Sequence, residues 1–143
     1  MPITIRNAVI SDYAAIAELA RTSLGYDCND ELVKDRLAHT DSDREAVFVA
    51  EKDGTVTGFV HAHIYEVLYY QPMINILGLA VSENQRRQGI GRLLMQRAEQ
   101  WAGDNGIELV RLNSGGKRTG AHEFYRSIGF DNEKVQLRFL KKI

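Results

Sequence analysis

The 143-residue sequence predicts an α/β fold built on a mixed sheet. Short apolar or alternating runs bounded by turn residues, which are typical of strands, recur along the chain. Asp53-Gly54 is a strong signal for a two-residue hairpin and joins two of these runs directly. Other runs are separated by segments whose apolar residues recur at helical spacing. Strands joined partly by hairpins and partly by helices indicate a mixed sheet.

Length and charge limit the classes of protein to consider. A chain of this length is expected to form a single domain, residues 1–143, that buries roughly two thirds of its unfolded surface. The 18 basic and 19 acidic residues argue against a nucleic-acid partner, which favours a basic excess. Cys28 is the only cysteine, so no internal disulfide is expected. No run reaches the length of a membrane span and no signal-peptide pattern is present, so we expect a cytoplasmic protein with no membrane partner.

The first third of the chain is expected to form a strand and two helices. Residues 3–6 alternate and predict a short strand. Ser11 is a good N-cap for an amphipathic helix that ends near Leu24. A second short helix is expected to turn three apolar side chains inward: Leu32, Val33 and Leu37.

The middle of the chain is expected to supply three strands. They cover residues 46–51, 55–69 and 74–81, and the third is apolar on both faces and therefore central. If alternation holds, one face of the second strand carries Phe59, His61, His63, Tyr65 and Val67. Gly78 lies inside the central strand, where a glycine marks a bulge or a close approach of another backbone.

The last third is expected to add a buried strand, a helix and a final strand. Residues 107–112 form the buried strand, and Gly129 is a natural C-cap for the helix that follows. The final strand alternates clearly, with Val135, Leu137 and Phe139 on one face.

The segment after residue 81 carries an unusual helix start. Ile90, Leu93 and Leu94 begin a helical pattern, but Gly89 and Gly91 lie in its first turn, where each glycine costs roughly 1 kcal/mol relative to alanine. Three cations crowd the same end, where the helix dipole disfavours them: Arg86, Arg87 and Arg92. Free backbone N–H groups, glycines and arginines together favour a phosphate or diphosphate ligand. A plain surface helix is the alternative interpretation.

Two motifs resemble the GNAT superfamily of acyl-CoA-dependent N-acyltransferases. Arg86-x-x-Gly89-x-Gly91 after a strand resembles its Q/R-x-x-G-x-G/A motif, and residues 118–130 resemble its C-terminal motif, with Ala121-x-x-Phe124-Tyr125 and a terminal Gly129-Phe130. One helix and one strand separate the two motifs, as in the family. The resemblance implies the GNAT fold, an α/β fold with a mixed central sheet of about six to seven strands flanked by about four helices. The narrower resemblance is to bacterial small-amine acetyltransferases.

The resemblance implies that acetyl-CoA is the co-substrate. The diphosphate would bind at the helix start, and the pantetheine arm would pair with the central strand, where one backbone N–H, that of Leu79, would polarise the thioester carbonyl. Arg118 stands where many members have an asparagine that contacts the pantetheine arm, and Asn113 is a candidate replacement. The cofactor-binding residues implied are Leu79, Ala80, Val81, Arg86, Arg87, Gln88, Gly89, Ile90, Gly91, Arg92, Asn113, Arg118, Phe124 and Tyr125.

The catalytic groups follow from the same resemblance. Tyr125 matches the general acid that protonates the thiolate leaving group, and its reference pKa of about 10 suits that transfer. A base must also take a proton from the amine, because an ammonium group cannot attack. Asn75 stands near the place where some members carry a glutamate base, so His61 and His63 on the neighbouring strand are the main candidates. Glu66 and the hydroxyl of Tyr69 are weaker ones. Ordinary half-exposed strand residues are the alternative for both.

The expected acceptor is a primary amine of a small molecule, such as an aminoglycoside, a polyamine or an aminoalkylphosphonate. A protein or peptide acceptor, and a non-catalytic acyl-CoA-binding module on the same fold, remain alternatives, because a fold does not fix function. The four histidines show no metal-ligand spacing with cysteine or acids, so no metal site is expected. A homodimer through Phe139 or Leu140 of the last strand is a further expectation.

Overall fold

The computed structural model describes residues 2–132 and 134–143 and divides the chain into two compact units. The first unit covers residues 1–112 and holds the sheet with three helices, and the second covers residues 113–143 and holds one helix. Each unit is described by itself below.

Five strands form one sheet in the first unit, and their order along the chain is also their order in space. The strands are β1 (Ile3–Asn7), β2 (Glu45–Lys52), β3 (Thr55–Tyr65), β4 (Met73–Val81) and β5 (Val110–Leu112). Successive strands from β1 to β4 are antiparallel, and β4 and β5 are parallel. The expected α/β class and mixed sheet are therefore confirmed, with five strands in the described part of the chain.

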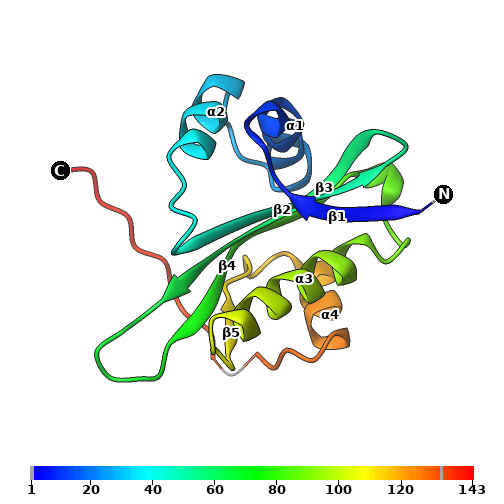
Figure 1. The fold of residues 1–143 in the computed structure, drawn as a ribbon. Helices are drawn as coiled ribbons and strands as arrows, with labels where there is room; N and C mark the ends of the chain where they lie inside the picture. The colour runs from blue at the N-terminus through cyan, green and yellow to red at the C-terminus, as the bar shows by residue number, and fades with distance from the viewer. Residues whose placement is uncertain (1, 133) are drawn as a thin grey trace. The chain divides into compact units, whose positions relative to one another are not determined.

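Helices cover both faces of this sheet. These helices, all in the first unit, are α1 (Tyr13–Ser23), α2 (Asp30–Ala38) and α3 (Ile90–Asp104). The second unit holds α4 (Thr119–Ser127). Figure 1 shows α1 and α2 on one face of the sheet and α3 on the other. Two short 3₁₀ turns, Ile10–Asp12 and Glu83–Gln85, precede α1 and α3. No helix of the described residues is long and apolar enough to cross a membrane.

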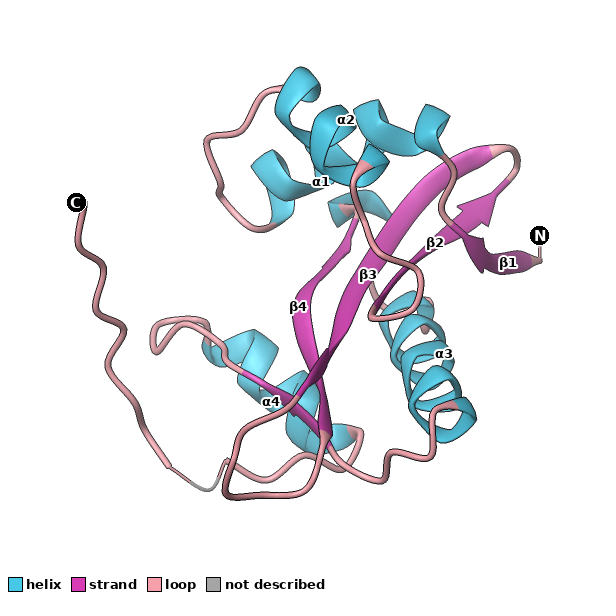
Figure 2. Cartoon of the chain, turned by 60° about the vertical axis from the view of Figure 1, so that its left-hand side comes forward, coloured by secondary structure: helices cyan, strands magenta, loops and turns pink. Residues whose placement is uncertain are grey.

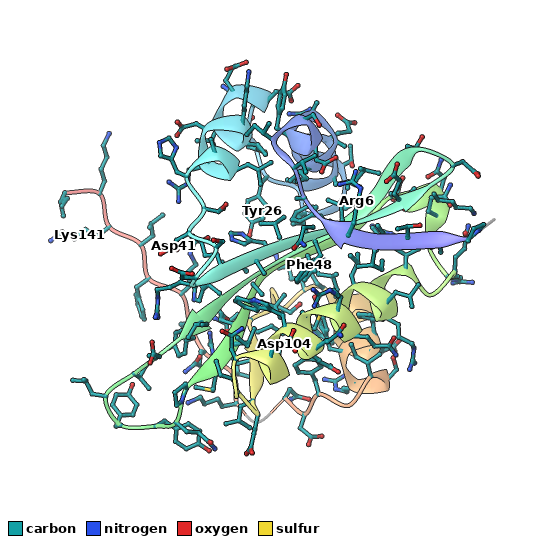
Figure 3. All side chains as sticks on the ribbon, viewed as in Figure 1. Arg6, Tyr26, Asp41, Phe48, Asp104 and Lys141 are labelled. Atoms are coloured by element: carbon teal, nitrogen blue, oxygen red, sulfur yellow. The ribbon has the colours of Figure 1, made fainter. Side chains whose placement is uncertain are left out.

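Each face of the sheet has its own core. On the α1 face the buried cluster consists of Ile16, Leu19, Val49, Phe59 and Ala80. The largest fully buried side chains elsewhere include Phe48 of β2 with Ile90, Leu94 and Met95 of α3. Figure 3 labels Phe48 in the interior, and the guanidinium of Arg97 from α3 lies 4.2 Å from the centre of its ring.

Two glycines explain how β2, β3 and α3 fit together. Asp53 and Gly54 both have positive φ angles, 53° and 77°, as a tight hairpin turn between twisted strands requires, which confirms the expected turn. A Cβ atom on Gly58 would lie 3.0 Å from the carbonyl oxygen of Ala80 and 3.1 Å from Leu94 Cδ1. Glycine at this position therefore lets α3 pack closely against β3 and β4.

The start of α1 differs from the expectation. Asp12, not Ser11, is its N-cap residue, and the Asp12 side chain does not cap the helix. The buried Asp12 carboxylate instead accepts hydrogen bonds from the Val9 backbone and from both terminal nitrogens of Arg6, at 2.8 to 3.0 Å. This ion pair joins β1 to the turn before α1 and lowers the pKa of Asp12, chiefly through the Arg6 hydrogen bonds. In α2, Val33 and Leu37 pack on the core as expected, but Leu32 is exposed.

The expected final strand is absent from the described residues. Residues 134–143 are extended but belong to no helix or strand, as Figure 2 shows, and Val135, Leu137 and Phe139 are exposed. An alternating sequence becomes a strand only when another strand bonds its backbone, and no such partner is present among the described residues. Two other strands are shorter than expected, since β3 ends at Tyr65 and β5 begins at Val110.

Candidate active site

A bulge interrupts β4 beside the predicted bases. The register between β3 and β4 pairs His61 with Gly78 and Ala62 with Ile76, so Leu77 is the extra residue on β4. Leu77 and Gly78 thus stand together opposite His61, and the bulge includes Gly78, the position expected to mark it. A bulge bends its strand and increases its twist, which turns the following residues away from a neighbouring strand.

Beyond this bulge, one edge of β4 has no strand beside it in the described part of the chain. β5 pairs with β4 only from Ile74 to Ile76, whereas β3 continues along the other edge to Val81. Ser82 N–H donates to the Thr57 carbonyl, and bonded and non-bonded pairs alternate in an antiparallel ladder. This alternation directs the backbone N–H and C=O of Leu79 away from β3, towards the open edge. A linear ligand with amide groups can therefore pair with β4 there.

The turn after β4 has a backbone conformation that suits an anion. Arg87 has a φ angle of 66°, in the left-handed region that a non-glycine residue seldom adopts, and Gly89, the N-cap of α3, has a φ angle of 79°. The first helical bond of α3 runs from Leu93 N–H to Gly89 C=O, so the N–H groups of Ile90, Gly91 and Arg92 have no partner within the helix. No side chain caps this end. Such turns and helix starts bind anions through their N–H groups.

The charges around this turn favour the same kind of ligand. Arg86, Arg87 and Arg92 are exposed, and no acid occupies the first turn of α3. Ile90 is 1% exposed, so its side chain belongs to the core. Lys52 from the end of β2 adds a fourth cation, which sequence reasoning missed because it lies far away in the chain.

Lys52 also fixes the turn. Its Nζ donates hydrogen bonds to Gln88 Oε1 at 2.7 Å and to Gln85 Oε1 at 3.3 Å. The predicted ligand residue Gln88 is thus held by a side chain from the hairpin rather than pointing freely to solvent.

The two predicted bases lie on the same face of β3, beside the bulge. His61 Nε2 is 2.9 Å from Glu45 Oε1 of β2, and Glu45 lies opposite His63 in the strand register. Burial raises the pKa of Glu45, but the hydrogen bond with His61 and one from the Asp41 backbone outweigh it and lower the pKa. Sequence reasoning did not single out Glu45, because only the β2–β3 register brings it to the histidines.

His63 differs from His61 in its surroundings. Its pKa is lowered, first by burial and then by the nearby positive groups His61, Arg111 and Arg44, while Glu45 acts in the opposite direction. Its ring stacks with that of Tyr65 at a centroid distance of 6.3 Å. His63 is therefore neutral at pH 7 and has a nitrogen that can accept a proton.

Asn75 has a structural partner on this face. Its Oδ1 accepts a hydrogen bond from Arg111 of β5 at 2.7 Å, and the Arg111 guanidinium lies 4.6 Å from the centre of the Tyr65 ring. Position 75, where the family resemblance suggested a carboxylate base, thus carries an amide that binds Arg111.

The second unit carries the predicted acid. Tyr125 of α4 packs edge-to-face against Phe124 and Phe130, with centroid distances of 5.4 and 5.9 Å. Burial raises the pKa of Tyr125, and the positive charge of Arg118 offsets part of this rise. The phenol therefore keeps its proton at pH 7.

The other predicted residues of this unit lie before and at the start of α4. Arg118 is the N-cap residue of the helix, and Asn113 directly follows β5. His122 Nε2 lies 2.8 Å from the Gly115 carbonyl oxygen, so its ring closes the loop before α4. Among the described residues, no three His, Cys, Asp or Glu side chains are grouped to hold a metal ion.

The structure therefore brings most of the predicted residues into two groups. Leu79, Ala80 and Val81 line the end of β4 and lead directly into the turn of residues 86–92, and His61 lies opposite the bulge. Asn113, Arg118, Phe124 and Tyr125 form the other group, in the second unit.

Comparison with known proteins shows which protein family this chain resembles. Residues 13–130 match the family model described as the acetyltransferase (GNAT) family. The aminoalkylphosphonate N-acetyltransferase of Salmonella typhimurium is 31% identical over 150 residues, which cover 100% of this chain and 94% of the relative. The aminoglycoside N(6')-acetyltransferase type 1 of Stenotrophomonas maltophilia is 31% identical over 142 residues, covering 95% and 91%.

Solved structures agree on the fold. The aminoglycoside acetyltransferase AAC(6')-Iy, in complex with a bisubstrate analogue of coenzyme A and acetylneamine, superposes with a TM-score of 0.84 over 100% of both chains at 17% identity. AAC(6')-Ih from Acinetobacter baumannii gives a TM-score of 0.84 at 20% identity over 99% of both chains.

Proposed function

The chain belongs to the GNAT acetyltransferase family and is an acyltransferase, and on this premise we propose that it transfers the acetyl group of acetyl-CoA to a primary amine of a small molecule. The amine attacks the thioester directly in a ternary complex. The single observation that carries this proposal is the open edge of β4, which runs from the bulge to the uncapped start of α3. Relatives named for aminoalkylphosphonates and aminoglycosides support a small acceptor, and polyamines are a third class.

The start of α3 is assigned the diphosphate of the coenzyme. The N–H groups of residues 87–92 are the assigned donors, and the left-handed φ angles of Arg87 and Gly89 are typical of backbone turns that bind anions. Arg86, Arg87, Arg92 and Lys52 supply positive charge around it. The diphosphate would thus replace the missing acidic cap of the helix.

The end of β4 is assigned the pantetheine arm. Its amides would pair with the edge of residues 79–81 as an additional strand does. The Leu79 N–H would then donate to the thioester carbonyl oxygen and stabilise the negative charge that develops there. In the second unit, Asn113, Arg118 and Phe124 are assigned contacts with the same coenzyme.

The reaction moves two protons besides the acetyl group. A base first takes a proton from the ammonium group, and the free amine nitrogen then bonds to the carbonyl carbon. The C–S bond breaks, and Tyr125 donates its phenolic proton to the departing thiolate. The phenolate recovers the excess proton that the attacking nitrogen carries once it has bonded to the carbonyl carbon, and the base releases its own proton to solvent, which balances the cycle.

His61 and His63 are assigned the task of base. His63 is neutral at pH 7, and His61 is held by Glu45, whose carboxylate would stabilise an imidazolium ion. Both rings lie on the face of β3 beside the bulge, at the residue pairs His61–Gly78 and His63–Asn75. A water molecule between histidine and amine would serve equally well.

An acceptor screen tests the proposal. Release of free thiol from acetyl-CoA is measured with an aminoalkylphosphonate, an aminoglycoside, spermidine and short peptides with free N-termini. Turnover with one of the first three is expected. Turnover with peptides alone would instead favour a protein N-acetyltransferase, like the 29% identical N-alpha-acetyltransferase of Sulfurisphaera tokodaii. Coenzyme binding without turnover of any amine would favour a non-catalytic acyl-CoA-binding module.

A further inference from the structure

A cavity of about 390 Å³ lies in the first unit, where β1 leaves the edge of β2. β1 stops pairing with β2 at Asn7, and the Ala8 N–H then donates to the Val47 carbonyl oxygen at 2.9 Å. The chain turns aside there, because the buried Asp12 carboxylate binds the next backbone N–H. In the described part of the chain, no strand therefore covers this edge of β2 at residues 45–46. The volume of the cavity is in the range of small-molecule sites, about 300–1,000 Å³.

The part of the cavity formed by α3 carries a positive charge without a counter-ion. Arg97 and Trp101 line it together, since residues four apart lie on the same face of a helix. The Arg97 guanidinium lies 4.2 Å from the centre of the Phe48 ring, and its Nη1 atom is buried without a hydrogen bond to any described residue. Among the described residues, no acid forms an ion pair with Arg97. A partly buried cation without a partner favours an anionic ligand.

Much of the remaining lining is apolar. Leu37 of α2 and Val47 of β2 contribute to it, together with Val9 and Ile10, which are 54% and 47% exposed. An apolar ligand group that covers these side chains removes their surface from water, which is favourable. The cavity therefore suits a ligand that has both an apolar body and an anionic head.

The charges of the lining restrict the anion to a single charge. Of the described residues that line the cavity, Arg97 and Glu45 are the charged ones. The Glu45 carboxylate already accepts a hydrogen bond from the Asp41 backbone and lies 2.9 Å from His61 Nε2, so Arg97 is the cation available to a ligand. One guanidinium matches one carboxylate in shape and charge, whereas a phosphate dianion would be held near an acid with a single cation to balance it.

We propose that this cavity binds a small organic carboxylate, with its head against the Arg97 guanidinium and its apolar body against Trp101, Leu37 and Val9. Among the described residues, none of those assigned above to acetyl-CoA lines this cavity. The site is thus additional to the proposed coenzyme site, and its occupation does not depend on which amine is acetylated.

Fluorescence of Trp101 tests the proposal, because Trp101 is the only tryptophan of the chain. Titration with hexanoate is expected to change the fluorescence in a saturable way, with a Kd of about 1 mM or less. Hexanamide has the same apolar body without the charge and is expected to bind at least about tenfold more weakly. The Kd for hexanoate is expected to be the same with and without coenzyme A, which distinguishes this cavity from the turn before α3.

A pair of variants tests the role assigned to Arg97. Arg97→Met keeps an unbranched side chain on Phe48 but removes the charge, and is expected to raise the Kd for hexanoate by about 10- to 100-fold. Lys34→Met is the matched control, since Lys34 also places its charge over a ring, 5.2 Å from the centre of Tyr13, but does not line the cavity. Urea denaturation checks that both variants fold, and the comparison of hexanoate with hexanamide needs no variant.

Four results would overturn the proposal. The first is the absence of a saturable change in fluorescence with hexanoate, and the second is equal binding of hexanoate and hexanamide. The third is an unchanged Kd in a folded Arg97→Met variant. The fourth is displacement of hexanoate by coenzyme A, which would place the carboxylate at the arginines before α3. None of these results bears on thiol release from acetyl-CoA, so the proposed acetyl transfer can fail or hold independently.

Discussion

Glu45 Oε1 lies 2.9 Å from His61 Nε2, and His61 lies opposite Gly78 at the bulge of β4. Because the carboxylate accepts this hydrogen bond, Nε2 carries the proton and Nδ1 is the nitrogen that can accept one in the neutral ring. The carboxylate of Glu45 on β2, the imidazole of His61 on β3 and the open edge of β4 therefore follow one another across three neighbouring strands. In the proposed reaction, this row is where the proton of the amine would be taken up.

Replacing Glu45 by glutamine tests this row. The Glu45→Gln variant keeps the size of the side chain but removes the charge that would stabilise an imidazolium at His61, so we expect kcat to fall by about 10- to 100-fold with little change in KM for acetyl-CoA. Glu18→Gln is the control, since Glu18 forms an exposed ion pair with Arg21 on α1, and its kcat is expected to stay within about twofold. Equal kcat values for the intact protein and Glu45→Gln would exclude Glu45 from catalysis.

The lowered pKa of His63 predicts that the stability of the protein depends on pH. Its folded pKa lies below its ordinary value of 6.5, first through burial and then through the charges of His61, Arg111 and Arg44, so the unfolded chain binds more protons over the interval below 6.5. The contribution of His63 to stability is therefore present above pH 6.5 and is lost as the pH falls below it. Urea denaturation at pH 7 and pH 5 should show a smaller loss for His63→Gln than for the intact protein. An identical loss would mean that His63 titrates normally.

The sequence predicted the elements of the site better than their contacts. The hairpin at Asp53-Gly54, the central strand and the glycine-bearing start of α3 depend on residues close together in the chain, so local patterns were sufficient. Glu45 and Lys52 were missed because their partners, His61 and Gln88, come together only through strand pairing and the packing of α3. No local pattern marks such contacts.

Two further differences have the same cause. The alternation of Val135, Leu137 and Phe139 predicted a final strand, and this prediction was wrong for the described residues, because a strand needs a pairing partner that an alternating pattern does not reveal. Ser11 was a good candidate cap by type, but the Arg6–Asp12 ion pair determines how the chain enters α1.

The close packing around Gly58 allows a prediction about stability alone. Alanine there would place its Cβ 3.0 Å from the Ala80 carbonyl oxygen, and that backbone atom cannot move without disturbing β4, so we expect Gly58→Ala to lower the free energy of unfolding by about 1–3 kcal/mol. Gly103→Ala in α3 is the control, since nothing lies within 4 Å of its added Cβ, and it is expected to stabilise the helix by up to about 1 kcal/mol. Chemical denaturation measures both. Equal stability of the two variants would show that the contact at Gly58 relaxes.

Gly89 predicts a link between backbone conformation and coenzyme binding. Its φ angle of 79° disfavours any side chain, although no atom lies within 4 Å of an added Cβ. Gly89→Ala should therefore distort the turn at a cost of roughly 1–2 kcal/mol and raise the Kd for coenzyme A by about tenfold. Calorimetry with coenzyme A measures the Kd, and Gly103→Ala again serves as the control. An unchanged Kd would place the diphosphate elsewhere.

Tyr125 makes the sharpest prediction about chemistry. Burial raises its pKa against the opposing charge of Arg118, so the phenol is protonated at neutral pH and can supply a proton to the thiolate. Tyr125→Phe preserves the ring packing with Phe124 and Phe130 but removes that proton, and kcat is expected to fall by about 100-fold or more while the Kd for coenzyme A stays unchanged. Thiol release and calorimetry measure the two quantities.

The proposed role of Tyr125 also predicts how activity depends on pH in the alkaline range. If Tyr125 is the acid, activity should decline only as the pH rises above the ordinary tyrosine value of 10.0, and Tyr125→Phe should lack this decline. Tyr13→Phe at the start of α1 is the matched control, because it removes a phenol outside the candidate site and should leave kcat unchanged. Turnover by Tyr125→Phe at the rate of the intact protein would exclude Tyr125 as the acid, and solvent water would then have to protonate the thiolate.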